Sequence, residues 1–452
     1  MKPDEAAFET AICDWLVTHG GYDACTLGNA QGQPTHFDPV RGIDTAELFA
    51  FIGATQADEW AKIVGLHGDP DVAQAKFLDR LAAELDKRGT IDVLRRGVHE
   101  YPATIRLLYP RPATGLTPEV VADYEANRVT VTRQLPYQAG STATLDLGLF
   151  VNGLLVATAE LKNPLTGQDV RHAKAQYRKD RDPANRALSK RAVVHFAVDP
   201  ELVFMTTQLA GEATRFLPFN LGRDKGAGNP ANPHGHRTSY LWERVWQRDA
   251  WLDLLARFVH VEKDSLGAKV PGRVVFPRFH QWDAVLALEA AAKAEGAGHR
   301  YLVQHSAGSG KSNTIAWLAH RLSNLHDHDD RKVFDKVVVI TDRVVLDRQL
   351  QETIGSFEHA QGVVERIDAG SRQLADALAG EQARIVITTL QKFGFVLDKV
   401  ADLPERSYAV IVDEAHSSQT GEAAKELRRV LGAPDPDRDP DTDRGDDPDL
   451  DL

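Results

Sequence analysis

The spacing of apolar residues along the chain changes from helical to strand-like near residue 128. Before that point, Phe8, Ile12, Trp15 and Leu16 recur at helical spacing, and two adjacent glycines at 20–21 end the run. The same amphipathic pattern covers about 46–64 and 71–88, and the second stretch ends at a glycine. We therefore expect the first part of the chain to be largely helical.

The pattern from residue 128 predicts a sheet. Three runs, 128–135, 145–151 and 154–162, have a strand-like pattern, and Asn152-Gly153 between the last two is a strong signal for a tight hairpin. A helix over about 169–179 and apolar runs at 191–198 and 202–207 follow. This region is expected to be mixed α/β.

The C-terminal half alternates strands with helices. After a Gly/Asn/Pro-rich loop and a helix over about 240–259, apolar runs stand at 301–304, 336–341, 384–389 and 408–412. Such alternation predicts a parallel, doubly wound sheet with buried strands. The expected domains are a mixed α/β domain at 1–245, a connecting helix and linker at 246–275, a parallel α/β lobe at 276–432, and an Asp/Pro-rich disordered tail at 433–452.

Length and composition fit a soluble protein of two or three domains. The chain has 452 residues, 42% of them hydrophobic and 26% charged. It has no apolar run long enough for a membrane span, and its acidic N-terminus does not resemble a secretory signal. Cys13 and Cys25 match no zinc or disulfide pattern and are expected to be small buried side chains in a cytoplasmic protein.

The net charge of −12 does not argue against DNA binding. Residues 435–452 contain nine aspartates and two arginines, a net charge of −7, which leaves −5 for the rest of the chain. A mildly acidic body can still carry a basic groove, because DNA binding depends on where the charge lies.

The string HSAGSGKSNT at 305–314 has the composition of a phosphate-binding loop before a helix. Gly308, Ser309 and Gly310 would let backbone N–H groups surround phosphate oxygens. Lys311 would reach the outer phosphates, and Ser312 would bind Mg²⁺. The helix is expected from about residue 313 to 322. These residues predict an ATP site.

A second string, IVDEAH at 411–416, supplies the acidic half of that site. Asp413 follows a predicted buried strand and would hold Mg²⁺ through water, and Glu414 would orient or activate the attacking water. Gln281, in FPRFHQ, would read the adenine edge through its amide. Because ITDRVVLDRQ (340–349) and TTLQKF (388–393) also follow apolar runs, chance agreement is a poor explanation for the whole set.

Asp146, Glu160 and Lys162 form a possible metal-dependent cleavage site. Two carboxylates can hold Mg²⁺ against a phosphate, and a lysine two residues along the same strand face can stabilise charge or help to generate the nucleophile. The alternative is a solvent-facing hairpin with ordinary surface charges. The order of these residues resembles the PD-(D/E)xK nuclease signature.

The hairpin makes a geometric demand on this site. With a plain two-residue turn at Asn152-Gly153, paired residue numbers would sum to 305, and Asp146 and Glu160 would lie on opposite faces of the sheet. A three-residue loop or a one-residue bulge changes the sum to 306 and places the two carboxylates opposite each other. We therefore predict a bulge or a longer loop, since opposite faces would exclude a shared metal.

The nuclease resemblance suggests three further residues. A helix glutamate often adds an acidic ligand in such nucleases, and Glu9 could do so, although a solvated position is the favoured interpretation. Gln176 and Tyr177 lie where related nucleases keep a Gln/Tyr element, but their adjacency differs from the expected Q-x-x-x-Y spacing.

The phosphate loop resembles the A-x-x-G-S-G-K-[ST] loops of superfamily-2 helicases, with His305 replacing the initial glycine of the general pattern. A nuclease followed by such a motor is similar to the restriction (R) subunit of type I restriction–modification enzymes over about residues 5–430. The strings that carry the resemblance are DLGLFVNG, AELKNPLTGQ, VHFAVD, FLPFNLG, GAGNP, FPRFHQ and DEAHSSQTG.

This resemblance implies a PD-(D/E)xK nuclease domain followed by one RecA-like lobe. It also implies ATP and Mg²⁺ as cofactors, double-stranded DNA as substrate, and methyltransferase and specificity subunits as partners. About fifteen residues separate DEAH from the acidic tail, so the sequence holds no second motor lobe and turnover by this polypeptide is expected to be poor. A stand-alone nuclease with a regulatory ATP lobe, and a non-catalytic product that binds DNA, ATP or partner subunits, remain alternatives.

Overall fold

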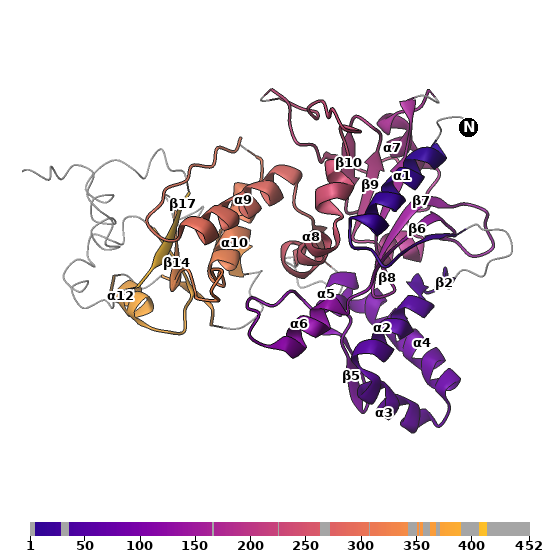
Figure 1. The fold of residues 1–452 in the computed structure, drawn as a ribbon, viewed down its shortest axis with the longest axis horizontal. Coiled ribbons are helices and arrows are strands. Elements are labelled where there is room, and N and C mark those ends of the chain that lie inside the picture. Colours follow the sequence, from indigo (N-terminus) through magenta and orange to yellow (C-terminus); the bar gives the residue numbers. More distant parts are fainter. Residues whose placement is uncertain are drawn as a thin grey trace, which may run out of the picture. The chain divides into compact units, whose positions relative to one another are not determined.

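The computed structural model shows two compact units, residues 1–282 and 283–452 (Figure 1). The residues that it describes are 5–28, 36–164, 167–224, 226–262, 272–306, 308–341, 350–351, 353–355, 362–367, 371–389 and 406–413. Among these residues, no helix combines the length and apolar character that crossing a membrane requires. The predicted tail at 433–452 lies outside the described residues.

The first unit is built on a mixed sheet. Its main path runs β1-β6-β7-β8-β9-β10-β11, and β3 also pairs with β8. The pairs β1·β6 and β8·β9 are parallel, and the other neighbours on the path are antiparallel. The strands are β1 (Ala24–Leu27), β2 (Phe37–Asp38), β3 (Ile43–Asp44), β6 (Val129–Leu135), β7 (Leu145–Val151), β8 (Leu154–Leu161), β9 (Val194–Val198), β10 (Val203–Thr206) and β11 (Leu217–Pro218). The mixed α/β prediction is confirmed.

Two helices pack where they can deliver side chains to the central strands. Helix α1 (Glu5–Thr18) packs against β1, β6 and β8, and its apolar positions Phe8, Ile12 and Leu16 are buried as the helical spacing predicts. Helix α7 (Val170–Lys179) packs against β8 and β9. The Asp169 carboxylate caps α7 by accepting a hydrogen bond from the Arg171 backbone N–H.

The remaining elements of the first unit form two further groups. Figure 1 shows α2, α3 and α4 together to one side of the sheet. This group comprises α2 (Thr45–Thr55), α3 (Ala57–His67), α4 (Pro70–Arg88), α5 (Thr90–Arg96), β4 (Val98–Glu100), β5 (Ala103–Ile105) and α6 (Pro118–Glu125). The other comprises the π-helical turns η3 (Leu241–Val245) and η4 (Leu254–Phe258), with α8 (Arg248–Asp253), β12 (His260–Glu262) and β13 (Arg273–Val275). A further π-helical turn, η2 (Ala187–Arg191), packs against β8 and α4. Trp246 and Trp251 are fully buried, so the segment expected to be a connection contributes to a core.

The second unit contains a parallel four-stranded sheet in the order β15-β16-β14-β17. Three of the four predicted buried runs are strands in it. Its elements are β14 (Lys336–Thr341), β15 (Val364–Arg366), β16 (Ile385–Thr389) and β17 (Tyr408–Val412), with helices α10 (Lys311–Leu322) and α12 (Ser371–Ala379). Helix α9 (Phe279–Glu295) begins in the first unit and ends in the second.

The prediction of a buried strand at 301–304 was wrong. These residues have no strand pairing, and Leu302 is 83% exposed. Only three of the four residues are apolar, and so short a run does not by itself distinguish a strand from extended chain. The phosphate loop therefore follows an exposed segment in this structure.

Candidate active site

The β7–β8 hairpin contains the predicted bulge. Its turn has left-handed backbone at both central residues, with φ of 50° at Asn152 and 80° at Gly153. Next to the turn, paired residue numbers sum to 305, as in Val151↔Leu154. Beyond a register shift they sum to 306, as in Leu147↔Ala159. One extra residue in β8 accounts for the change, and the bulge prediction is confirmed.

The shifted register brings Asp146 and Glu160 to one face of the hairpin, because continuing the 306 sum makes them opposite neighbours. Both side chains are buried. Asp146 Oδ2 accepts a hydrogen bond from the Leu161 backbone N–H at 2.7 Å and lies 3.8 Å from Nζ of Lys162. Lys162 Nζ also donates to the Leu161 carbonyl oxygen at 2.8 Å. The three predicted residues are therefore together.

Glu160 is fully buried and bound on one oxygen only. Its Oε1 accepts from Nε of Arg181 at 2.6 Å, while its Oε2 has no hydrogen-bond partner within the described part of the chain. Burial and the nearby Asp146 carboxylate raise the pKa of Glu160 well above its usual range, against the opposing charges of Arg181 and Lys162. A buried carboxylate oxygen without a partner is a costly arrangement, and a cation would satisfy it.

Glu9 is buried beside this pair, so its expected solvated position was wrong. Its Oε1 accepts from the Gln134 amide at 2.6 Å, and its Oε2 lies 3.6 Å from Nε of Arg133. Burial, followed by the Asp146 carboxylate, raises the pKa of Glu9 from 4.5 to about 7. Glu9 could therefore act as a third acidic group close to Asp146.

Two residues of this cluster were missed in the sequence. The Gln134 amide also lies 3.4 Å from Asp146 Oδ1, and its φ of 50° is a left-handed value that non-glycine residues rarely adopt. Arg181 follows the end of α7 and pairs with Glu160. No local pattern marks either residue, because each acquires its partners only when distant strands and helices pack.

Tyr177 is buried between α7 and β8. Its hydroxyl lies 2.7 Å from Oγ1 of Thr158 on β8, and Thr158 lies 2.8 Å from Nδ1 of His195. Burial lowers the pKa of His195 to about 4, so this histidine is neutral near pH 7. Gln176 is only half-buried. The adjacent pair thus places Tyr177 in a core contact that fixes α7 on β8.

The carboxylates do not converge as an assembled metal cage. In the described residues, no group of three or more His, Cys, Asp or Glu side chains has the arrangement of a metal site. Asp146 and Glu160 nevertheless fit a hard cation, because both present carboxylate oxygens and Glu160 Oε2 has no partner among the described groups. Glu9 is bound to the Gln134 amide, which also contacts Asp146.

The phosphate-loop residues precede a helix as predicted. Gly308 and Gly310 have φ values of 71° and 88°, which favour glycine, and α10 starts at Lys311. The Ser309 N–H donates to the Ser306 carbonyl oxygen at 3.2 Å. Ser312 lies in the first turn of α10. This gives the backbone geometry of a glycine turn that leads into a helix N-terminus.

Asp413 lies at the carboxyl end of β17, and α10 packs against β14 and β17 of the same sheet. The Asp413 N–H donates to the Ile340 carbonyl oxygen at 2.9 Å. Glu414 lies outside the described residues. Gln281 belongs to the first unit, where it is buried and accepts from the Arg278 backbone N–H at 2.9 Å. The roles predicted for these residues stay predictions.

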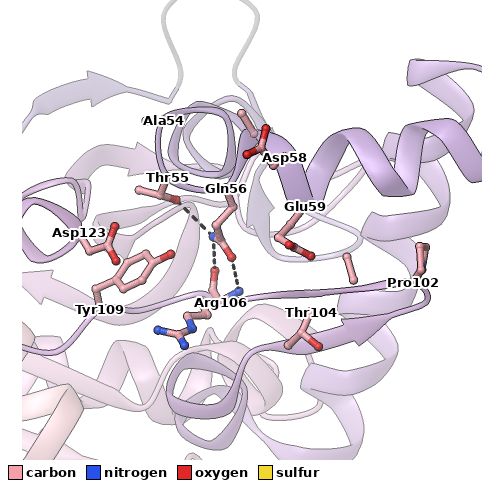
Figure 2. Close-up of a pocket in the computed structure, with 12 residues that line it drawn as sticks. Ala54, Thr55, Gln56, Asp58, Glu59, Pro102, Thr104, Arg106, Tyr109 and Asp123 are labelled. Carbon is pink, nitrogen blue, oxygen red and sulfur yellow. Dashed lines mark hydrogen bonds between the residues drawn. The ribbon is translucent and has the colours of Figure 1, made fainter. Parts of the chain in front are cut away.

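A hollow of ≈ 820 Å³ lies elsewhere in the first unit, between α2, α3 and β5 (Figure 2). Figure 2 shows the Gln56 side chain bridging to the Arg106 backbone, with which it exchanges two hydrogen bonds of 2.7 and 3.0 Å. None of the predicted site residues lines this hollow. We assign the Gln56 contacts to holding the junction of α2 and α3 against the chain that follows β5.

Two family models match separate parts of the chain. Residues 115–214 match the type I restriction enzyme R protein N terminus, and residues 280–434 match the SWI2/SNF2 ATPase family. The chain thus combines a region similar to a restriction-enzyme N terminus with a region similar to an ATPase. The chain is similar to the N-terminal region of the R subunits of type I restriction–modification enzymes.

Individual relatives agree with this assignment. The chain is 27% identical over 304 residues to the type I restriction enzyme HindI endonuclease subunit of Haemophilus influenzae, a match covering 65% of this chain and 28% of that protein. It is 22% identical over 334 residues to the MjaVIIIP endonuclease subunit of Methanocaldococcus jannaschii, covering 68% and 30%. A C-terminal part of the MpnIIP endonuclease subunit of Mycoplasma pneumoniae is 30% identical over 132 residues, covering 28% of this chain and 60% of that one. The chain thus spans under a third of the length of the first two relatives.

Proposed function

We propose that residues 1–245 form a PD-(D/E)xK nuclease domain that cleaves double-stranded DNA with Mg²⁺. The observation that carries this proposal is the bulge in β8, which places Asp146 and Glu160 on one buried face beside Lys162. A sheet that needs only structural charges gains nothing from burying two carboxylates as neighbours, because each raises the cost of ionising the other.

Asp146 and Glu160 would hold the cation. When bound, Mg²⁺ supplies Lewis acidity to the scissile phosphate and lowers the pKa of water. Lys162, which lies 3.8 Å from Asp146, would contribute its positive charge to the pentacovalent phosphate. Glu9 is close enough to add a third negative charge at the same place, and its raised pKa makes it able to take up a proton near neutral pH.

We infer that residues 276–432 form a RecA-like lobe that binds Mg·ATP. The loop at 308–312 would cradle the phosphates, with Lys311 on the outer phosphates and Ser312 and Asp413 at Mg²⁺. Gln281 would contact adenine, and Glu414 would orient water. In the complete R subunit this lobe would take part in ATP-driven DNA translocation within a complex with methyltransferase and specificity subunits.

Cleavage by the purified chain tests the nuclease assignment. Supercoiled plasmid is incubated with Mg²⁺, with and without ATP, for the wild type, Asp146→Asn and Asp14→Asn. Asp14 is an exposed acid on α1 and provides a matched acid-to-amide control. We expect cleavage to be lost in the Asp146 variant and kept in the control. Equal cleavage by the wild type and Asp146→Asn would reject the site.

Nucleotide binding separates the remaining possibilities. Binding of a fluorescent ATP analogue is compared between the wild type and Lys311→Ala. Cleavage that is altered by ATP and depends on Lys311 supports a nuclease regulated by its ATP lobe. ATP binding without cleavage, lost in Lys311→Ala, supports a nuclease that acts only within the larger complex. If neither ATP binding nor DNA cleavage is detected, the result supports a non-catalytic product.

A further inference from the structure

Arg181 contacts Glu160 closely but has no role in the chemistry proposed above. Its Nε and Nη2 atoms both lie 2.6 Å from Oε1 of Glu160, and the side chains of the pair are 5% and 0% exposed. Its Nη2 also donates to the Thr144 carbonyl oxygen at 2.7 Å. The guanidinium carbon lies 5.4 Å from the centre of the Tyr137 ring. The guanidinium is therefore fixed from three sides.

A second contact sets the position of Arg181 along β8. Tyr177 lies four residues earlier and contacts Thr158, which lies two residues before Glu160. Thr158 and Glu160 share one face of the strand because strand side chains alternate. Two side chains from α7 and the residues just after it thus meet two successive side chains on that face. The spacing of the helix, and not only the reach of a flexible arginine, holds Arg181 against Glu160.

Each carboxylate of the cluster has a separate cation. Arg133 lies 3.6 Å from Glu9, Lys162 lies 3.8 Å from Asp146, and Arg181 lies at 2.6 Å from Glu160. The Arg181 contact is the shortest of the three and uses only Oε1 of Glu160. The second oxygen, Oε2, has no hydrogen-bond partner in the described structure. Glu160 is thus bound through one oxygen, while its other oxygen is buried without a hydrogen-bond partner among the described residues.

We propose that Arg181 is a positioning residue that holds Oε1 of Glu160 so that Oε2 faces the divalent cation. The inference rests on the proposed nuclease function and extends it to a residue outside the nuclease signature. Arg181 stays paired with Glu160 when the metal binds, and it keeps that buried carboxylate in one rotamer. Groups that orient metal ligands in this way commonly change metal affinity by about 10–100-fold when removed.

If Arg181 instead competed with the metal ion, removing it would change metal affinity in the opposite direction. If Arg181 were a placeholder that occupies the cation position and leaves on binding, its removal would delete a competing positive charge. Metal affinity would then rise. Metal binding to Arg181 variants therefore separates a positioning residue from a competitor, and a purely structural ion pair would change stability without changing metal affinity.

The test uses the full chain and Mn²⁺, whose binding is followed by electron paramagnetic resonance without DNA. We compare the wild type, Arg181→Gln, Arg181→Lys and Arg171→Gln, the last being a control on α7 whose side chain is 81% exposed. We expect Arg181→Gln to weaken Mn²⁺ binding about tenfold or more. The control is expected to match the wild type. Unchanged or tighter binding in Arg181→Gln would overturn the proposal.

Arg181→Lys keeps the proposal testable if Arg181→Gln does not fold. A lysine keeps the charge, but its single ammonium cannot hold Glu160 and the Thr144 carbonyl oxygen as the guanidinium fork does. We expect Arg181→Lys to bind Mn²⁺ with intermediate affinity, and cleavage at saturating metal to recover more than cleavage at low metal. If Arg181→Gln does not fold, wild-type Mn²⁺ affinity in Arg181→Lys would reject the role.

The same measurements distinguish this inference from the function on which it rests. A wild type that neither binds Mn²⁺ nor cuts DNA would reject the nuclease assignment itself. A wild type that does both, with Arg181 variants that bind Mn²⁺ normally, would reject the positioning role alone.

Discussion

Replacing Glu9 with glutamine is expected to stabilise the metal-free first unit above neutral pH. Burial and Asp146 raise the pKa of Glu9 from 4.5 to about 7, so the folded state binds this proton more tightly than the unfolded chain does. The contribution of Glu9 to the free energy of unfolding is therefore fully present below about pH 4.5. It decreases as the pH rises towards 7 and stays lost at higher pH. The amide in Glu9→Gln removes this dependence.

The size of the effect follows from the two pKa values. Linkage gives about 1.4 kcal/mol for each pH unit between them, or about 3 kcal/mol in full. Water that reaches the carboxylate and salt in the buffer lower this figure, so we expect about 2 kcal/mol between pH 5 and pH 8. Most of that cost reflects loss of water around the carboxylate rather than repulsion, since burial is the larger cause.

Tryptophan fluorescence can report on the first unit alone. Of the seven tryptophans in the sequence, Trp317 is the one beyond residue 282. In a Trp317→Phe background, urea unfolding is followed in EDTA from pH 5 to pH 8.5. The difference in unfolding free energy between the background and Glu9→Gln is expected to grow by about 2 kcal/mol in favour of the variant. Asp14→Asn should show the same pH dependence of the unfolding free energy as the Trp317→Phe background. If the unfolding free energies of the background and of Glu9→Gln changed equally with pH, the reasoning would be refuted.

Three further substitutions test other parts of the structure. Gly153→Ala should destabilise the first unit by about 2 kcal/mol or more in urea unfolding, because φ is 80° and the added carbon would lie 2.4 Å from a backbone oxygen; a loss below about 0.5 kcal/mol would contradict this. Thr158→Val should cost about 1–3 kcal/mol, since Tyr177 and His195 each lose a buried partner, and an unchanged urea midpoint would count against that network. Gly308→Ala, at φ of 71°, should weaken binding of a fluorescent ATP analogue about tenfold through about 1–2 kcal/mol of strain, with full affinity arguing against a phosphate role.

Local patterns were sufficient for the features that depend on neighbouring residues. The Asn152-Gly153 turn, the strands on either side and the glycine turn before α10 could each be predicted, because their signals lie within a few positions. The bulge could be predicted for a different reason. Chemistry required Asp146 and Glu160 on one face, and only an extra residue satisfies the parity of the strands.

The features that sequence reasoning missed depend on distant packing. Glu9 stands 125 positions before Gln134, its partner, and helical spacing alone could not show that this face of α1 would be covered. Arg181 reaches Glu160 only because α7 folds back on β8. At 301–304 the sequence predicted a strand that the structure does not contain. An apolar run forms a strand only where another strand pairs with it, and none of the described residues pairs with this run.

The bulge in β8 also constrains how the gene can change. Substitutions around the hairpin alter one side chain at a time, but an insertion or deletion of a single residue between Asp146 and Glu160 would reverse the face of one carboxylate relative to the other. Only a paired change would restore the sum of 306. In this hairpin the number of residues is therefore under tighter constraint than their identities, and loss of one codon would be more damaging than most replacements.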